Sequence, residues 1–217
     1  MSILYGVSPS PFVRKVMLAH AHKNIPYEMK ITLPGSDEVE FRQASPMGKI
    51  PGYKTDDGAA FADSSVIIAY LERISSHNAL YPEKASDYAQ ALWLEEWGDS
   101  ELMSATNALY FQRVVGPAFF NHETDVKRVQ EILTELLPKV FDLLESRIIE
   151  KSWLIGEQLS IADITVGSCL VSLLHANYQL DQSRWPKLDS YNKRFLALPI
   201  VETQITSEQS VINHATS

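Results

Sequence analysis

The sequence predicts an α/β part followed by an all-α part, and three observations support this fold class. Before about residue 78, short apolar strands alternate with amphipathic helices. After about residue 87, apolar residues recur almost only at helical spacing. The net charge of -8 lies entirely beyond residue 80, because residues 1–80 carry eight basic and eight acidic side chains. We therefore expect a first domain at 1–78, a linker at 79–86 and a helical domain at 87–217.

The first part has the element order strand, helix, strand, loop, hairpin, helix. Ile3–Tyr5 is short and apolar, and a helical pattern follows it before the alternating strand Tyr27–Leu33. Residues 34–48 are rich in Pro and Gly and predict a loop. Tyr53–Phe61 predicts a hairpin, because Asp57-Gly58 is a strong turn signal. Two strands joined by a crossover helix, plus a hairpin, give a mixed four-stranded sheet covered by helices.

The second part is helical throughout. An i, i+3, i+4 rhythm runs from Val126 to Ile148, and Pro138 interrupts it, so we expect a kink there. Ser160-Ile161-Ala162-Asp163 has the form of a capping box, with Asp in the place that Glu or Gln usually takes. It predicts the start of an apolar helix that reaches about Tyr178.

Composition and motif spacing exclude several classes of function. The acidic second part argues against nucleic acid or an anionic membrane as a partner. Cys169 is the only cysteine, so one chain can form neither a disulfide nor a Cys-x-x-Cys pair. The six histidines lack metal-ligand spacing, and we expect neither a metal site nor a redox cofactor. Neither a secretory signal nor a membrane-spanning stretch is recognisable, and we expect a cytoplasmic protein.

The stretch Ser8–Val16 is the first of two motifs that suggest a site. It follows the first strand and places Ser10 where a helix begins, with Pro11 suited to the first helical position. A hydroxyl and a helix N-terminus both stabilise a thiolate, so Ser10 is a candidate catalytic residue. Ser10 would equally serve as an ordinary N-cap, and the residues alone leave both roles open.

The second motif is Ser45–Pro51 followed by Asp63-Ser64. Ile50-Pro51 suits a cis-proline turn that leaves the backbone of Ile50 available to an extended peptide. Asp63-Ser64 opens a helix, whose N–H groups bind a carboxylate well, and Asp63 could accept an ammonium group. Capping alone would also explain these two residues. Together the two motifs suit a small anionic peptide that carries a thiol.

These residues resemble the cytosolic glutathione S-transferase family, with a thioredoxin-like first domain and an all-helical second domain. The resemblance rests on Ser10-Pro11-Phe12, Gly48–Pro51, Asp63-Ser64 and Trp153–Gly156 before the capping box, and it covers nearly the whole chain. The pattern around Ser10 is similar to the serine-type classes, and we assign no class. Asp63 departs from the family, which more often has Glu at this position.

The resemblance implies roles for individual residues. Ser10 would contact the sulfur of glutathione, with Tyr5 as the alternative because some classes use a tyrosine near the end of the first strand. The other implied glutathione-binding residues are Lys49, Ile50, Pro51, Asp63 and Ser64. Tyr110, Phe111 and Arg113 are candidates for the electrophile site, although aromatic residues at such spacing are more often core.

The resemblance implies a glutathione transferase that joins the glutathione thiolate to a hydrophobic electrophilic small molecule, as in detoxification. Glutathione would be a co-substrate, with no other cofactor, and the chain would form a homodimer. One alternative is a glutathione-dependent thiol or peroxide reductase, although Ser10 stands where such members carry Cys. Another is a non-catalytic binding or regulatory module, since one fold serves several functions.

Overall fold

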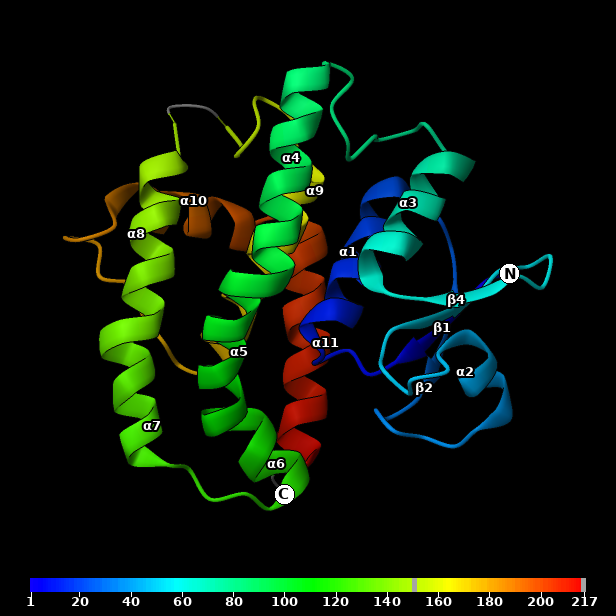
Figure 1. Ribbon diagram of the computed structural model, residues 1–217, viewed down its shortest axis with the longest axis horizontal. Helices are drawn as coiled ribbons and strands as arrows, with labels where there is room; N and C mark the ends of the chain where they lie inside the picture. Colours follow the sequence, from blue (N-terminus) through cyan, green and yellow to red (C-terminus); the bar gives the residue numbers. More distant parts are fainter. Residues whose placement is uncertain (150–151, 216–217) are drawn as a thin grey trace. The chain divides into compact units, whose positions relative to one another are not determined.

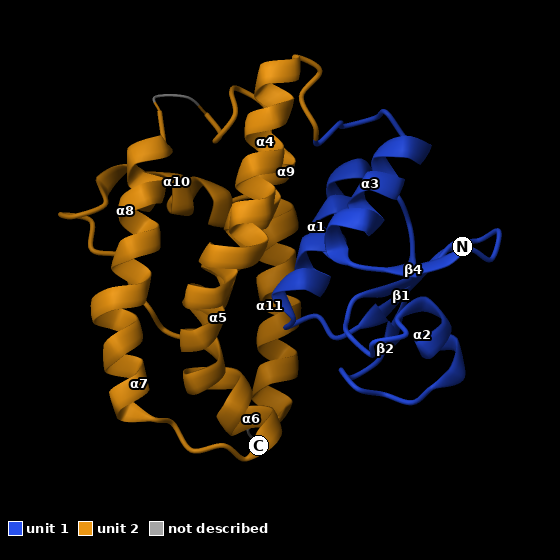
Figure 2. Cartoon of the chain, viewed as in Figure 1, with its two compact units in different colours: residues 1–80 blue, residues 81–217 orange. Residues whose placement is uncertain are grey.

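The computed structural model describes residues 1–149 and 152–215. The chain separates into two compact units, which comprise residues 1–80 and 81–217 (Figure 2). None of the described helices is long and apolar enough to cross a membrane. Each unit is described by itself below.

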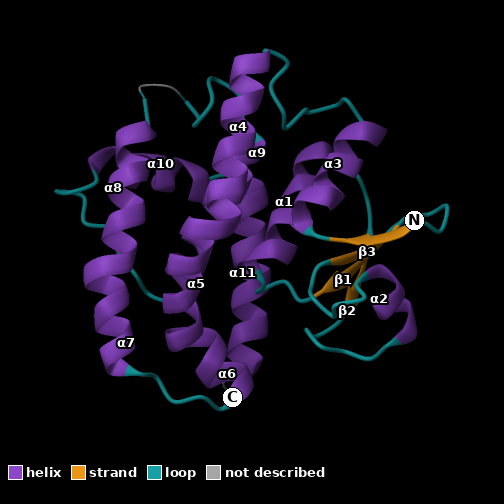
Figure 3. Cartoon of the chain, viewed as in Figure 1, coloured by secondary structure: helices purple, strands orange, loops and turns teal. Residues whose placement is uncertain are grey.

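Unit 1 is built on a mixed four-stranded sheet, as the sequence predicts (Figure 3). Strand β1 (Ile3–Gly6) pairs in parallel with β2 (Glu28–Ile31), and in antiparallel fashion with β3 (Gly52–Lys54). Strand β3 also pairs with β4 (Ala60–Ala62), which completes the order β2-β1-β3-β4. The predicted hairpin and the predicted parallel pair are both confirmed.

The two faces of this sheet carry different helices (Figure 1). Helices α1 (Pro11–Lys23) and α3 (Ser64–Ile74) pack together on one face, and α2 (Val39–Ala44) covers the other. Alternate residues of a strand point to opposite faces. Leu4, opposite Tyr53, therefore points to α1 and α3, whereas Tyr5, opposite Gly52, points to α2.

Helix α2 lies inside residues 34–48, where the sequence analysis expects only a loop, and that expectation was wrong. The helix has six residues, of which Phe41 and Ala44 are buried. A helix of about one and a half turns has too few apolar positions to give a periodic pattern. The surrounding prolines and glycines, in turn, favour the prediction of a loop.

The regular elements among the described residues of unit 2 are all helices, apart from an isolated β-bridge between Trp153 and Gly156. The unit contains α-helices and three short π-helical segments, labelled η. In chain order they are α4 (Ala85–Trp97), η1 (Gly98–Leu102), α5 (Met103–Tyr110), η2 (Phe111–Val115), α6 (Gly116–Phe120), α7 (Val126–Glu131), η3 (Ile132–Leu136), α8 (Leu137–Arg147), α9 (Ile161–His175), α10 (Pro186–Leu196) and α11 (Pro199–Ala215). Helix α4 thus begins within residues 79–86, which the sequence analysis assigns to a linker.

Two of the π-helical segments end two residues before a proline. Segment η3 precedes Pro138, where the sequence predicts an interruption, and η2 precedes Pro117 at the same spacing. Proline lacks the N–H that an α-helix needs at this position. The helix accommodates each proline through a local change in its hydrogen-bond pattern.

Helix α9 forms the centre of unit 2 and is buried over almost its entire length. Its start is the capping box that the sequence predicts. The Asp163 carboxylate accepts bonds from the Ser160 N–H at 2.9 Å, the Ser160 hydroxyl at 2.8 Å and the Leu154 N–H at 3.0 Å. The side chain of Asp163 is fully buried, and these three bonds replace the water that it loses.

Candidate functional site

Ser10 is the N-cap of helix α1. Its backbone is extended (φ -70°, ψ 125°), and its hydroxyl oxygen accepts a long bond of 3.5 Å from the Val13 N–H. The side chain is only partly buried. An oxygen that accepts this bond still carries its own hydrogen as a donor. The capping role and the catalytic role that the sequence analysis leaves open therefore use different parts of one hydroxyl group.

Gly6, at the end of β1, allows the start of α1 and the proline turn to approach each other. A Cβ atom at Gly6 would lie 2.6 Å from Val13 Cγ2 and 3.5 Å from Ile50 Cβ. Only a residue without a side chain fits between them. The Ile50-Pro51 bond is cis. The first turn of α1, headed by Ser10, and Ile50 are thus neighbours on either side of one glycine.

The loop before this turn is shaped by Arg42. Its guanidinium group donates to three backbone carbonyl oxygens, those of Gly35 at 2.9 Å, Ser36 at 2.7 Å and Pro46 at 3.3 Å. The Ser45 hydroxyl donates to the Lys49 carbonyl oxygen at 2.6 Å. The backbone at residue 49 is therefore fixed, whereas the Lys49 side chain is exposed to solvent.

Asp63 and Ser64 lie where α3 begins, as the sequence predicts. Asp63 is exposed, and its Oδ1 atom accepts from the Ser65 N–H at 2.9 Å and from the Val66 N–H at 3.3 Å. Its backbone has φ +83° and ψ 130°, a conformation that residues other than glycine rarely adopt. Ser64, the first residue of the helix, is 4% exposed. Strained residues of this kind cluster at ligand sites.

Lys15 belongs to this region, although the sequence analysis does not single it out. It lies in α1, its side chain is fully buried, and its Nζ donates to the Ser65 hydroxyl at 3.0 Å. The two residues are 50 positions apart, and nothing in the local sequence pattern connects them. The bond links α1, which Ser10 caps, to the first turn of α3.

Tyr5, the alternative to Ser10, lies in the core on the α2 face of the sheet. Its ring centroid is 6.1 Å from that of Phe41, and the Lys30 ammonium lies 5.6 Å above the ring. Burial, with a smaller contribution from Glu40, raises the pKa of the Tyr5 phenol, which therefore stays neutral. Helix α1 and its N-cap Ser10 lie on the other face.

The three candidates for the electrophile site divide into two clusters within unit 2. Tyr110 is fully buried with its ring centroid 6.3 Å from that of His175, and Arg113 donates to the Ala176 carbonyl oxygen at 3.0 Å. Both thus lie at the C-terminal end of α9. Phe111 instead packs among other aromatic rings, which belong to Phe120 and His122.

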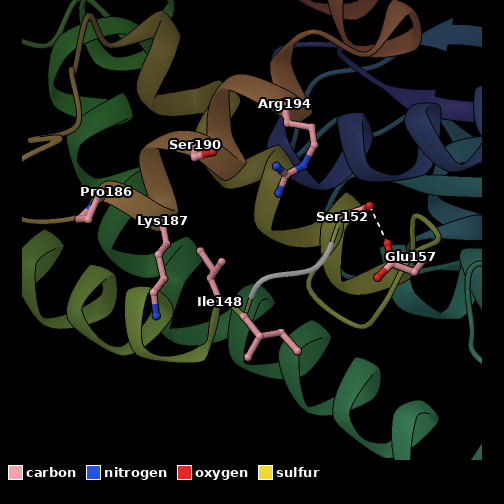
Figure 4. A pocket seen from close by; sticks show the side chains of 8 residues that line it. Ile148, Ser152, Glu157, Pro186, Lys187, Ser190 and Arg194 are labelled. Carbon is pink, nitrogen blue, oxygen red and sulfur yellow. Dashed lines mark hydrogen bonds between the residues drawn. The ribbon is translucent and has the colours of Figure 1, made fainter.

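Unit 2 also has an open hollow of about 530 Å³ (Figure 4). Lys187, Ser190 and Arg194 line it from one side of α10, and Ser152 and Glu157 line it from the segment before α9. None of the site residues that the sequence predicts lies there. In the described part of the chain, no group of three or more His, Cys, Asp or Glu side chains is placed to hold a metal ion.

Comparison with known proteins identifies the class to which this fold and these residues belong. Residues 4–79 match the glutathione S-transferase N-terminal domain, and residues 111–208 match the C-terminal domain of the same family. The chain therefore belongs to the glutathione S-transferase family, as the sequence motifs predict.

Individual relatives agree with this assignment. Glutathione S-transferase U4 of Arabidopsis thaliana is 23% identical and aligns with 97% of this chain and 91% of its own length. Elongation factor 1-gamma of Danio rerio is 32% identical over 59% of this chain and 27% of its own length.

Solved structures show the same fold. A glutathione S-transferase from Rhodospirillum rubrum superposes with a TM-score of 0.87, at 23% identity, over 100% of this chain and 99% of that one. A glutathione S-transferase from Methylobacterium radiotolerans, solved in complex with glutathione sulfonate, superposes with a TM-score of 0.74. It is 21% identical and covers 94% of each chain.

Proposed function

We propose that this protein is a glutathione transferase in which Ser10 stabilises the glutathione thiolate for attack on an electrophilic small molecule. The observation that carries the proposal is the position of Ser10 at the N-cap of α1, beside the turn formed by Ile50 and Pro51. The core position of Tyr5 on the opposite face supports Ser10 over that alternative.

The physical task is to lower the pKa of a thiol. An ordinary cysteine thiol has a pKa of about 8.5, so roughly 3% is thiolate at pH 7. A decrease of about two units would make most of it thiolate, which requires about 2.7 kcal/mol of preferential stabilisation. A hydrogen bond to a charged group contributes about 1.5–3 kcal/mol, and a helix N-terminus about 0.3–1 kcal/mol. The Ser10 hydroxyl and the α1 N-terminus together account for this amount.

The reaction follows from that stabilisation. The thiol proton leaves to solvent, and the Ser10 hydroxyl donates a hydrogen bond to the resulting thiolate. The sulfur then bonds to the electrophilic carbon, and the displaced electron pair leaves with the leaving group. Holding the two reactants side by side supplies the rest of the rate enhancement.

The remaining residues hold the peptide. The backbone of Ile50, next to cis-Pro51, pairs with the cysteinyl residue of glutathione as a short added strand. The Ser64 hydroxyl and N–H bind the γ-glutamyl carboxylate at the start of α3, and Asp63 accepts from the ammonium group. Lys49 reaches the glycine carboxylate. Tyr110, Phe111 and Arg113 remain our candidates for the electrophile site.

The chain is proposed to act as a homodimer in detoxification. Partly exposed apolar side chains on both units, such as Val66 at 50% and Trp93 at 42%, offer apolar area for a second copy.

The test is a titration of bound glutathione, followed by thiolate absorbance in the ultraviolet. Wild type should show a thiol pKa well below that of free glutathione. Ser10→Ala should return the thiol pKa most of the way to about 8.5, leaving only the smaller decrease due to the α1 N-terminus, whereas Ser10→Thr, which keeps a hydroxyl, should retain most of the decrease. Tyr5→Phe should leave it unchanged. A low pKa that survives Ser10→Ala but not Tyr5→Phe would move the role to Tyr5, and no binding by wild type would refute the proposal.

A second candidate is a non-catalytic module, which the similarity to elongation factor 1-gamma favours. A protein that binds glutathione with an unchanged thiol pKa, and forms no conjugate with 1-chloro-2,4-dinitrobenzene, would support it. The reductase alternative is less favoured, because the only thiol, Cys169, is fully buried in α9.

A further inference from the structure

The hollow in unit 2 has a basic side along helix α10. Lys187, Ser190 and Arg194 are three and four positions apart, so they share one face of that helix, and all three line the hollow (Figure 4). Two positive charges on one face stand out in this unit, because residues 81–217 carry eleven basic and nineteen acidic side chains. Neither Lys187 nor Arg194 forms an ion pair within the part of the chain that the structure describes.

Arg194 is held in place by two aromatic rings. Its guanidinium carbon lies 5.7 Å from the centre of the Trp153 ring and 6.0 Å from that of Tyr191. These distances suit cation–π contacts, which fix a long side chain before a ligand binds. Its Nε atom is buried and has no hydrogen-bond partner among the described residues. Because a planar guanidinium group binds a carboxylate through two parallel hydrogen bonds, Arg194 is a preorganised site for one acidic group.

Lys187 supplies a second positive charge two helical turns from Arg194. Seven residues of α-helix correspond to about 10 Å along the helix axis. The backbone N–H groups at the start of α10 are already bonded, because the Glu145 carboxylate accepts from those of Lys187 and Leu188 at 3.1 and 2.8 Å. The helix start compensates the charge of Glu145. A ligand in the hollow would therefore meet the side chains of α10 and not its N-terminus.

The rest of the hollow combines an apolar wall with one carboxylate. Ile148 and Ile149 line it directly after α8, and Ile149 is 52% exposed. The carboxylate belongs to Glu157, which accepts a hydrogen bond from the Ser152 hydroxyl at 2.7 Å. Two positive charges thus outnumber one negative charge around the hollow. Its volume of about 530 Å³ falls within the range of small-molecule sites, about 300–1,000 Å³.

We propose that this hollow binds a small, elongated organic anion that has an acidic group at each end and an apolar middle. One acidic group binds the Arg194 guanidinium, the other binds the Lys187 ammonium, and the Ser190 hydroxyl donates to the ligand between them. The apolar middle packs against Ile148 and Ile149. None of the residues proposed to hold glutathione lines the hollow, so this site goes beyond the proposed function.

The chain contains a matched control for Lys187. Lys193 belongs to the same helix, and its side chain is 65% exposed and pairs with Asp189 at 2.7 Å. It does not line the hollow. Lys187→Met and Lys193→Met therefore remove the same charge from the same helix, but only the first removes it from the hollow.

The experiment compares the dissociation constants of two linear anions by calorimetry at low salt. Suberate has a carboxylate at each end of an apolar chain, and octanoate has the same chain with one carboxylate. Suberate should bind wild type about fivefold more tightly, because only suberate reaches both cations. Lys187→Met should abolish this difference by weakening suberate about fivefold and octanoate less than twofold. Arg194→Met should weaken both anions about tenfold, and Lys193→Met should change neither by more than about twofold.

Every other outcome counts against the inference. Equal affinity of wild type for the two anions would show that no second charge takes part. A loss for Lys193→Met as large as that for Lys187→Met would show only general attraction to α10. Absence of suberate binding at millimolar concentration would refute the site. If Arg194→Met does not fold, Lys187→Met decides the matter, because that side chain is exposed. The thiol pKa of bound glutathione enters none of these outcomes, so this inference and the proposed function can fail separately.

Discussion

Two helices of this protein, one in each unit, have an aspartate that accepts hydrogen bonds at their N-terminal end, Asp63 as the N-cap of α3 and Asp163 in the first turn of α9. The two aspartates differ in almost every physical respect. Asp163, at the start of α9, is buried and accepts three hydrogen bonds through both carboxylate oxygens. Asp63, at the start of α3, is exposed, uses Oδ1 for both of its bonds and has φ +83°. An aspartate that stabilises the fold is thus buried and has both carboxylate oxygens engaged in hydrogen bonds. Exposure combined with backbone strain is what we expect of an aspartate that binds a ligand, as proposed for Asp63.

The largest expected effect comes from Asp163→Asn. The amide keeps the shape of the side chain, but its NH₂ group cannot accept, so at least one of the donors from Ser160 and Leu154 loses its partner inside the protein. A buried unpaired polar group costs about 1–3 kcal/mol, and the loss of charged hydrogen bonds adds to this. We expect unfolding in urea to show a loss of about 3 kcal/mol. A loss below about 1 kcal/mol would mean that the buried carboxylate is not a structural requirement.

The two units also contain buried titratable groups whose effects on stability have opposite signs when the pH falls. Burial lowers the pKa of His20 in unit 1 to about 4, whereas burial raises the pKa of Asp163 in unit 2 above its ordinary value. Between pH 6.5 and 4, His20 is protonated in the unfolded chain but remains neutral in the folded chain. The free energy of unfolding therefore falls as the pH falls. Asp163 has the opposite sign, since the folded state takes up its proton first.

Protonation of His20 in the unfolded chain should therefore lower the free energy of unfolding by about 3 kcal/mol between pH 7 and pH 4. Urea unfolding across this range, compared between wild type and His20→Phe, measures it. The variant keeps an aromatic ring beside Tyr27 and Tyr53, and its stability should vary less over this range. If the two pH dependences coincide, His20 does not titrate as its burial requires.

The smallest effect on stability, and the sharpest test of the comparison, is Asp63→Asn. Asparagine caps helices as well as aspartate does and tolerates positive φ, so stability should change by less than about 0.5 kcal/mol. Glutathione binding should nevertheless weaken about tenfold, because the amide carries no charge to meet the ammonium group. Calorimetry and urea unfolding of the same sample give both values. Unchanged binding would show that Asp63, like Asp163, serves only the fold.

Much of this structure follows from local sequence patterns. The hairpin at Asp57-Gly58, the helix that begins after Asp63 and the capping box of Asp163 each depend on residues within a few positions of one another. Such features are readable because turn and cap chemistry is local. Helix α2 was missed because six residues carry too little periodicity.

The choice between Ser10 and Tyr5 could not be made from the sequence. It depends on which face of the sheet α1 covers, and strand alternation says only that Leu4 and Tyr5 point to opposite faces. The register of β1 with β3 and the position of Phe41 place Tyr5 on the α2 face, and for this reason we propose Ser10. The Lys15–Ser65 hydrogen bond could not be predicted from the sequence for the same reason, because only tertiary packing brings the two residues together.

The backbone angle of Asp63 has a consequence for engineering a more heat-stable protein. Among the described residues, the other non-glycine positions with positive φ are all asparagines, Asn24, Asn78, Asn121 and Asn177, with φ between 46° and 54°. Glycine at these four positions adopts the same angle without steric cost. A stabilisation campaign guided by backbone geometry would rank Asp63 first, at φ +83°, and would thereby change the residue that we assign to the ligand. That campaign should begin with the asparagines and leave Asp63 in place.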